Sequence, residues 1–528
     1  MRIAPFFAAI ERLGAKWARR QPLAALTCAL LVLLVRAAEL PRLPVPEPWI
    51  HDEFSFLLAA DTFASGRLVN LTHPLWTHFE SFHINQIPTY VSMYPPGQGL
   101  ALAAGQVFFG NPWAGALLTT ALFCGVLCWM LQGWLPPGWA FLGGMLATMR
   151  IGVFTGLANS YSGTALAGIG GALLFGAFPR IVRRPRAYHA LLLGLGLAIL
   201  ANTRPYEGLV ASIPVAIALL VWMATGMPGL RVAMVKVILP VALVVLPAAG
   251  ATCYYFYRAT GDPFRMPYLV NRETYAVTPY FLWQSFRPEP VYRHEVMRKF
   301  YLEWEPAFQN ALGQNTLDGW LLAAHNKVSR AWHCYLGFAL TLPLIAFPCL
   351  FKDRRVRFFL LSAPVWLAGL GLARYTQPYY IIPLAGACYV IVLQSMRHLR
   401  QWRVRGHQAG LLLLRAVCFV CFAAFVAQVI IPYVDPPYPG NLERAQILRH
   451  LESLPGRQLV IVRYSPEHQV VKEWVYNRAD IDHAKVVWAR DMGSADDQQL
   501  FRYFHDRAVW LVEPDQQPPR LSPYIPPQ

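Results

Sequence analysis

The sequence predicts a polytopic α-helical membrane protein with about 11–13 spans, followed by a small extracytoplasmic α/β domain. The first observation is composition: the 528 residues are 55% hydrophobic and only 14% charged, whereas an ordinary soluble domain is about 25% charged. The second is the recurrence of apolar runs of spanning length up to residue 432. Beyond them, helix-like and strand-like segments alternate, which favours a small α/β domain.

Eleven apolar runs approach the ~20 residues that are needed to cross ~30 Å of hydrocarbon. They lie at 21–38, 113–131, 138–156, 161–178, 188–203, 205–225, 233–252, 332–351, 356–373, 376–395 and 410–432. A further run at 97–110 is shorter, and we expect it to be interfacial or re-entrant. The first run has no small-residue cleavage site, so we expect it to be an uncleaved first span.

Basic residues cluster at the ends of these runs and predict which ends are cytoplasmic. The clusters lie at 12–20, 180–186, 231–236, 352–357 and 397–405. If all are cytoplasmic, the N-terminus is cytoplasmic and the C-terminal domain extracytoplasmic, in a multi-pass protein of a bacterial inner membrane. The net charge of +17 then reflects these clusters and their contacts with acidic membrane lipids. Because no motif for base readout accompanies the charge, we expect no nucleic-acid partner.

The predicted organisation has three parts. Residues 1–432 form the transmembrane domain, with outer loops at 39–112 and 253–331. Residues 441–515 form the α/β domain, in which the helix-like NLERAQILRHLESL precedes the strand-like QLVIVRY, AKVVWAR and RAVWLVEP. No GxGxxG loop occurs there, so nucleotide binding has little support. The Pro-rich residues 516–528 are expected to be a loose terminus.

A polar triplet stands directly after the first span, at His51, Asp52 and Glu53. In one interpretation the two acidic residues cap the N-terminus of a helix and face its positive dipole end. In the other, Asp52 is a general base or a metal ligand, and Glu53 tunes or orients it. In that case we expect His51, together with His83 later in the same loop, to bind the substrate.

The same outer loop carries a second acidic candidate, Glu80, with His73, His78 and His83 at a five-residue spacing. Histidine and carboxylate together could hold a divalent metal. The spacing matches no standard zinc pattern, so a divalent metal stays possible and no cofactor is certain.

Two further outer boundaries combine an arginine with a tyrosine. The first has Arg204, Tyr206 and Glu207, and the second has Arg374 and Tyr375. Ionisable residues at such a depth are functional candidates, and an arginine could bind a lipid phosphate through bidentate hydrogen bonds. For Arg204 the alternatives are an ion pair with Glu207 or an extension of its side chain toward the headgroups.

Several motifs of 49–115 together resemble the membrane-embedded glycosyltransferases of the GT-C type. These are the acidic pair after the first span, a helix ending ASGRL, an FE dipeptide and the stretch YPPGQGLALAAGQVFFGNPWAGALL. The nearest resemblance is to the dolichyl-phosphate-mannose:protein mannosyltransferase and aminoarabinose transferase superfamily. It implies Asp52 as catalytic base, Glu80 at the later acidic position and a polyprenyl-phosphate-linked sugar as donor. Ser81 stands where aminoarabinose transferases often have Lys, so the phosphate contact would come from elsewhere.

The predicted function is therefore that of an integral membrane glycosyltransferase. It would move a sugar, with inversion, from a polyprenyl-phosphate-linked donor to an acceptor hydroxyl at the extracytoplasmic face. The acceptor could belong to a protein, a glycolipid or a polysaccharide. We expect loop 253–331 to cover the site and the C-terminal domain to bind the acceptor or a partner. The alternatives are a transporter or flippase of a lipid-linked sugar, which would show internal repeats, and a non-catalytic membrane scaffold.

Overall fold

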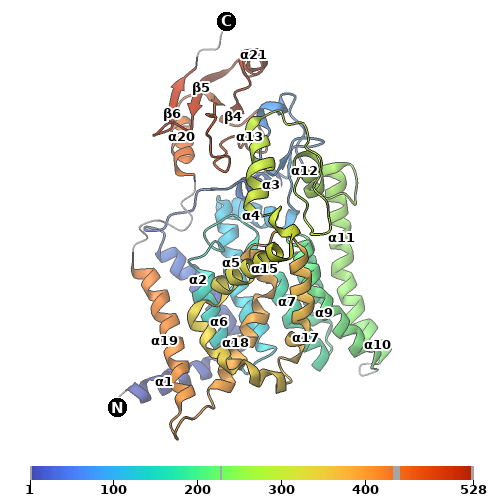
Figure 1. Cartoon of the computed structure of the whole chain (residues 1–528), viewed down its shortest axis with the longest axis vertical. Coiled ribbons are helices and arrows are strands. Elements are labelled where there is room, and N and C mark those ends of the chain that lie inside the picture. Colours follow the sequence, from blue (N-terminus) through green and yellow to red (C-terminus); the bar gives the residue numbers. More distant parts are fainter. Residues whose placement is uncertain (1–2, 226–228, 432–440, 525–528) are drawn as a thin grey trace.

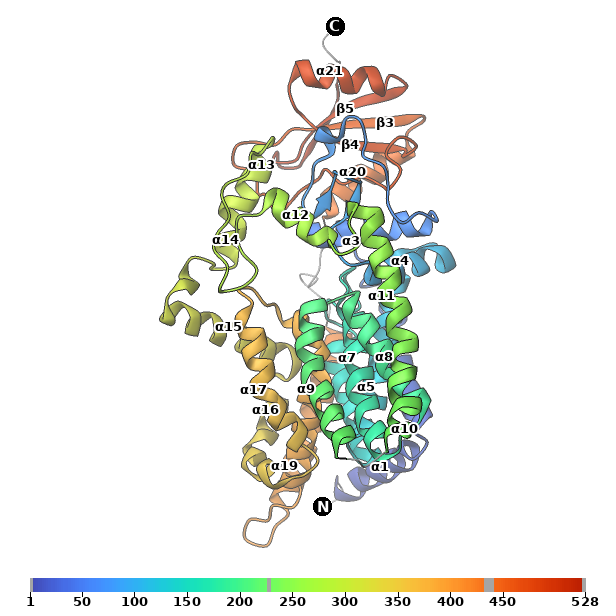
Figure 2. The ribbon, with the colours of Figure 1, turned by 90° about the vertical axis from the view of Figure 1, so that its right-hand side faces the viewer.

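The computed structural model describes residues 3–225, 229–431 and 441–524. A bundle of helices occupies one end of the molecule and a small sheet occupies the opposite end (Figure 1). The segments of the first outer loop and of residues 262–315 lie between them (Figures 1 and 2). The Pro-rich stretch YVDPPYPG at 433–440, whose composition predicts a linker, falls outside the described residues.

Each of the eleven predicted apolar runs coincides largely with a helix or with a pair of consecutive helices. The long single helices of the bundle are α2 (Gln21–Ala38), α5 (Pro112–Gln132), α7 (Thr164–Arg183), α9 (Pro205–Ala224), α11 (Leu239–Thr260) and α19 (Ala409–Ile430). Shorter or composite ones are α6 (Pro137–Ala147) with η2 (Thr148–Gly152), α8 (Ala187–Ala201), α17 (Arg357–Leu372) and η7 (Pro378–Leu384) with α18 (Ala385–Leu399).

Fewer helices have the length and apolarity of a complete span than the predicted count of about eleven. Seven such helices are found within the described residues, or eight if the bent pair Leu317–Tyr335 and Gly337–Lys352 counts as one span. The three remaining apolar runs form shorter helices: α6 has 11 residues and continues into η2, α8 has 15 residues, and α17 has 16. The bent pair turns by 101°. The polytopic helical architecture is as predicted, and only the count is lower.

Basic residues mark one end of the bundle. α1 (Ile3–Ala18) and α10 (Leu230–Ala233) both lie at the end far from the sheet (Figure 1). Both carry basic residues of the predicted cytoplasmic clusters, among them Lys16 and Arg231. The arrangement agrees with a cytoplasmic N-terminus, and the orientation in a membrane stays a prediction.

The C-terminal unit is a four-stranded sheet with two helices. The strand order is β4-β3-β5-β6, with β3 (Arg457–Val462) parallel to both β4 (Val486–Arg490) and β5 (Arg507–Glu513). The helices are α20 (Leu442–Ser453) and α21 (Ser494–Tyr503). The expectation of a loose terminus was wrong for β6 (Arg520–Pro523), which pairs antiparallel with β5 and thereby gives the backbone of β5 a second row of partners.

The two predicted outer loops, 39–112 and 253–331, contain helices, and the first also contains two short strands. The first contains α3 (His51–Ala64), η1 (Trp76–Phe79), β1 (Ile84–Asn85), β2 (Val91–Ser92) and α4 (Pro96–Phe109). The second, expected as one long loop, contains α12 (Pro267–Tyr275), α13 (Glu295–Arg298), η4 (Lys299–Trp304), α14 (Glu305–Phe308), η5 (Gly313–Asn315) and the start of α15 (Leu317–Tyr335).

The first outer loop is packed against the C-terminal unit. The ring of Phe54 stacks on Tyr476 with centroids 4.0 Å apart, and both belong to one apolar cluster that also contains strand residues of the sheet. Asp61 accepts hydrogen bonds from the backbone N–H of Ala479 and from Arg478. Because stacked aromatic rings and buried area both stabilise this contact, the sheet holds α3 in place.

Candidate active site

The N-terminus of α3 is capped by Glu53. Its Oε2 accepts hydrogen bonds from the N–H groups of Trp49 (2.7 Å) and Ile50 (3.4 Å), and its Oε1 accepts one from Tyr161 (3.0 Å). Burial raises the pKa of this carboxyl, opposed by those N–H donors. Of the two acidic residues, Glu53 is therefore the one that caps the helix. The contacts of Glu53 favour a positioning role over a catalytic one.

Replacing Glu53 by Ala should lower the melting temperature of the purified protein. The change leaves the N–H groups of Trp49 and Tyr161 without their acceptor, and an unsatisfied buried donor such as that of Tyr161 costs about 1–3 kcal/mol. Thermal unfolding in detergent, followed by intrinsic fluorescence, measures the loss. Glu53→Gln keeps one acceptor oxygen and should lose less. Wild-type stability in Glu53→Ala would contradict the structural role.

Asp52 is oriented differently from its neighbour, toward other side chains of the outer loop. Its Oδ1 accepts hydrogen bonds from His83 Nδ1 (2.6 Å) and from the hydroxyl of Tyr94. Within the described residues, Oδ2 has no hydrogen-bond partner, and the side chain is 20% exposed. Burial alone would raise the pKa of Asp52, but His83, His51 and Tyr94 outweigh it and hold that pKa below its ordinary value. Asp52 is therefore an ionised carboxylate with one oxygen available.

The backbone at His83 is unusual. Its φ is +59°, in the left-handed region that few residues other than glycine adopt. Its carbonyl accepts a hydrogen bond from the hydroxyl of Ser55, one turn after Asp52 on α3. Such a conformation costs free energy and persists where the surroundings enforce it. Here it places the imidazole of His83 against Asp52.

Asp52 and two histidines form a cluster of metal-ligand type. One ligand atom each from His51, Asp52 and His83 lies within 4.8 Å of the others. Burial and the nearby His83 lower the pKa of His51 to about 3, so its imidazole is neutral, as metal coordination requires. Its Nδ1 is buried without a hydrogen-bond partner among the described residues. These donors fit a divalent cation bound by nitrogen and oxygen.

The other histidines of the predicted five-residue series lie outside this cluster. His73 Nε2 contacts Asp482 at 3.1 Å, and His78 Nε2 contacts Asp497 at 3.3 Å. Both partners belong to the C-terminal unit, so these two histidines help to dock that unit onto the loop. Of the three histidines at five-residue spacing, His83 therefore belongs to the candidate site, and His73 and His78 contact the C-terminal unit.

Arg204 precedes α9 and lies over aromatic rings. Its guanidinium carbon is 3.9 Å from the ring centroid of Tyr380 and 5.7 Å from that of Tyr379. In the described parts of the chain its side chain forms no ion pair and no hydrogen bond, so the expected pair with Glu207 is a through-space attraction only. A guanidinium with unsatisfied donors over a tyrosine face is well suited to bind an anion.

Tyrosines connect Arg204 with Asp52. Tyr380 is within electrostatic reach of both Arg204 and Asp52, and so is Tyr94. Tyr375 also interacts electrostatically with Asp52. Its ring packs edge-on against that of Tyr380, with the ring centroids 6.1 Å apart. The structure therefore brings together two residues that are about 150 positions apart in the sequence. Tyr94, Tyr379 and Tyr380 carry no signal of this role in the sequence, because tyrosines are common at any membrane interface.

The remaining predicted residues have other contacts. Arg374 is 3% exposed and donates hydrogen bonds to the carbonyls of Ala311 (2.9 Å) and Leu282 (3.3 Å). It secures the segment 262–315, so the expectation that it binds phosphate beside Arg204 finds no support in its contacts. Tyr206 donates to the carbonyl of Gly369, and Glu207 accepts from Tyr280.

Glu80 is buried away from Asp52. It accepts a hydrogen bond from the hydroxyl of Tyr275 (2.8 Å), and His294 Nε2 and Arg293 Nη1 lie 3.4 and 3.6 Å from it. Within the described residues it makes no contact with the Asp52 cluster. Its position favours a role in holding α12 and α13 against the first loop.

Comparisons with known proteins rest on structure alone, since no family model and no curated protein sequence matches the chain. ArnT from Cupriavidus metallidurans bound to undecaprenyl phosphate superposes with a TM-score of 0.52 at 13% identity, over 92% of each chain. Its apo structure gives 0.50 at 14% identity, again over 92% of each. The oligosaccharyltransferase from Archaeoglobus fulgidus in complex with Zn and sulfate gives 0.51 at 10% identity, over 93% of this chain and 67% of that one. At these identities the likeness shows a shared fold.

Proposed function

We propose, starting from the GT-C-type fold that the chain shares with these structures, that it is an integral membrane glycosyltransferase. It transfers a sugar from a polyprenyl-phosphate-linked donor to an acceptor hydroxyl at the extracytoplasmic face of a bacterial inner membrane. The observation that carries the proposal is the pairing of Asp52, with one free carboxylate oxygen, and Arg204, with unsatisfied donors, across a cluster of tyrosines.

Asp52 acts as the general base in this proposal. As the acceptor oxygen attacks the anomeric carbon, Asp52 Oδ2 takes the acceptor's proton. The bond between that carbon and the phosphate oxygen breaks, and the polyprenyl phosphate leaves with the bonding electrons. Attack from the side opposite the leaving group inverts the anomeric centre. The hydrogen bonds from His83 and Tyr94 keep Asp52 ionised at neutral pH and fix its orientation.

Arg204 binds the phosphate of the donor. Charge builds up on that phosphate as the sugar bond breaks, so a fixed guanidinium stabilises the transition state more than the ground state. Tyr379 and Tyr380 hold the guanidinium by cation–π contacts and leave its N–H groups available. The solved ArnT structure with undecaprenyl phosphate supports this class of lipid as the carrier.

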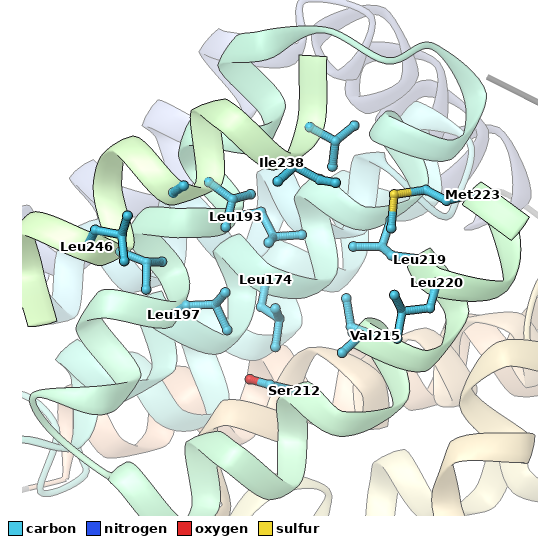
Figure 3. Close-up of a pocket in the computed structure, with 15 residues that line it drawn as sticks. Leu174, Leu193, Leu197, Ser212, Val215, Leu219, Leu220, Met223, Ile238 and Leu246 are labelled. Atoms are coloured by element: carbon cyan, nitrogen blue, oxygen red, sulfur yellow. The ribbon is translucent and has the colours of Figure 1, made fainter. Parts of the chain in front are cut away.

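An apolar groove in the bundle suits the hydrocarbon chain of the donor. It has a volume of about 460 Å³ and is lined by α7, α8, α9, η3 (Met234–Ile238) and α11. Figure 3 shows Leu193 and Leu219 directed into it, with Ser212 at its edge. Ser212 follows Arg204 by eight residues along α9, or roughly 12 Å at 1.5 Å per residue. A lipid whose phosphate binds Arg204 can therefore extend its chain toward this groove.

Sugar transfer in purified membranes tests the proposal. Membranes that contain the wild-type chain receive a panel of radiolabelled polyprenyl-phosphate sugars, and label is followed into protein, glycolipid and polysaccharide fractions. Transfer from one donor of the panel identifies both the sugar and the acceptor class. Absence of transfer from every donor, in membranes with normal amounts of folded protein, would contradict the glycosyltransferase proposal. It would favour a flippase of a lipid-linked sugar, which flipping assays would then test.

The cluster of His51, Asp52 and His83 is proposed to bind a divalent cation, as the zinc complex of the archaeal oligosaccharyltransferase also suggests for this fold. A cation there would supply positive charge beside the acceptor hydroxyl. We expect the purified chain to bind Zn²⁺ in calorimetry and His83→Ala to weaken that binding at least tenfold, as loss of a direct ligand should. His73→Ala, in the same loop but outside the cluster, is the matched control. Equal Zn²⁺ binding by wild type and His83→Ala would refute this site.

A further inference from the structure

A second cavity lies between the C-terminal sheet and the segment that follows α12. Its volume is about 770 Å³. One wall is the carboxyl ends of β3 and β4 with the residues that follow them, and the other is α13 and the first residue of η4. Figures 1 and 2 both place α13 beside the sheet, on the side of α3 away from the bundle. The cavity therefore opens far from the apolar surface of the spans.

The direction of the strands favours this edge of the sheet. Strands β3, β4 and β5 run in the same direction, so their carboxyl ends lie at one edge. In open sheets with parallel strands, ligands bind outside the carboxyl ends of the strands. Residues directly after β3 and β4, Arg463, Tyr464 and Asp491, line the cavity.

Two buried polar atoms of the cavity lining have no hydrogen-bond partner among the described residues. They are Nη1 of Arg490 and Nε2 of His468. The side chain of Arg490 is 3% exposed; its Nε donates to the carbonyl of Glu80, and its Nη2 pairs with Glu473 at 2.7 Å. His468 is held by Asp515 through Nδ1. Buried polar atoms normally find a hydrogen-bond partner, so both atoms indicate that the cavity takes a polar ligand.

The remaining charges of the lining favour an anion. Lys299 Nζ contacts only the carbonyl of Pro466 within the described residues, and Arg293 reaches Glu80 at 3.6 Å. The acidic residues are largely engaged: Asp491 pairs with Arg463 and Glu295 with Arg298. The third lining carboxylate, Asp496, is exposed at the start of α21. Lys299 is thus the lining cation that pairs with no carboxylate, and Arg490 keeps one buried N–H group without a partner among the described residues.

The cavity is separate from the Asp52 site but shares structural elements with it. Lys299 lines the cavity, whereas the next residue, Phe300, packs its ring against His51 with centroids 4.9 Å apart. On the other side, Arg490 holds the carbonyl of Glu80. η4 and the loop before His83 therefore form a common wall of the two sites.

We propose that this cavity is a second ligand site, which binds a phosphate- or carboxylate-bearing molecule from the water phase through Lys299, Arg293 and Arg490. The site stands on its own observations and does not depend on the glycosyltransferase activity. Its place beside η4 makes the anionic part of an acceptor the natural occupant if the proposed function holds.

Calorimetric titration of the full-length chain in phosphatidylcholine nanodiscs tests the site. Inorganic pyrophosphate and citrate serve as the phosphate and carboxylate probes. We expect saturable, salt-sensitive binding of at least one of them. Lys299→Gln should weaken it about tenfold, as the loss of a hydrogen bond from a charged donor does. Lys472→Gln, an exposed lysine of the same unit outside the lining, should leave it unchanged.

The outcomes separate this proposal from the previous one. Binding that persists in Asp52→Asn but falls in Lys299→Gln supports the second site, whatever happens to sugar transfer. Absence of saturable binding of both probes, or equal binding by wild type and Lys299→Gln, overturns it. Loss of probe binding in nanodiscs that contain phosphatidylglycerol would assign the cavity to a lipid headgroup and overturn the water-phase source.

Discussion

Asp52→Asn is expected to lower the rate of sugar transfer by about 10²–10⁴-fold, the usual contribution of a general base. Asparagine keeps the size of the side chain and its hydrogen bond to Tyr94, but its oxygen cannot accept the acceptor's proton at neutral pH. The variant should fold normally, because the cap of α3 comes from Glu53. Initial rates with the radiolabelled donor, at equal amounts of monodisperse protein, measure the effect.

The control for this prediction is Asp61→Asn, a change of the same kind in the same helix. Asp61 accepts hydrogen bonds from Ala479 N–H (2.9 Å) and Arg478 (3.1 Å), and so connects α3 to the C-terminal unit. The Asp61→Asn substitution should lower the stability of the protein somewhat and leave the rate of transfer by the folded protein within a few-fold of wild type. If Asp52→Asn transfers sugar as fast as Asp61→Asn does, Asp52 is not the base.

Arg204→Gln is expected to reduce kcat/KM for the lipid-linked donor by about 10²-fold or more, as the loss of a fixed donor to a developing negative charge does. Glutamine can still donate one hydrogen bond but carries no charge for the departing phosphate. The cation–π contacts with Tyr379 and Tyr380 are lost as well. Kinetics over a range of donor concentrations measure the change, and Arg204→Lys should recover part of the activity, since it restores the charge but not the bidentate geometry.

Arg258→Gln provides a matched control. Arg258 also lies near a tyrosine ring, 5.9 Å from the centroid of Tyr254, but on the exposed end of α11. Its replacement should leave the kinetics unchanged. A similar loss in both variants would mean that basic charge near the membrane surface, and not phosphate binding by Arg204, supports activity.

The helical fold could be read from the sequence because spanning helices are specified locally. A run such as 113–131 must satisfy its backbone hydrogen bonds within itself in hydrocarbon, so apolarity and length suffice to predict α5. The motifs near Asp52 led in the same way to the GT-C-type fold, which the solved structures confirm. Strands β3, β4 and β5 of the C-terminal unit could also be predicted from their sequences. Strand β6 could not, since its four residues form a strand only through pairing with β5.

The site was predictable in part, and Asp52 and Glu53 show the limit. Both residues are acidic and they are adjacent, so neither composition nor capping preference shows which one caps the helix and which one acts in the site. Successive residues on a helix point in directions about 100° apart, and only the folded chain shows which direction leads to backbone N–H groups and which to His83 and Tyr94. One was therefore assigned to the cap and the other to the site by tertiary structure.

The arginines make the same distinction over a longer range. Arg204 and Arg374 each stand near a tyrosine at the outer end of an apolar run, so local sequence does not distinguish them. In the structure Nη1 and Nη2 of Arg374 donate to the carbonyls of Ala311 and Leu282, whereas the guanidinium of Arg204 contacts ring faces and forms no hydrogen bond within the described residues. The sequence by itself determined the spans, the C-terminal unit and the chemical types present at the outer face, because those follow from local composition and periodicity. Which polar groups are already satisfied by the backbone, and which are left to act on a ligand, was decided only by the tertiary structure, because hydrogen-bond partners come from segments that are far apart in the chain.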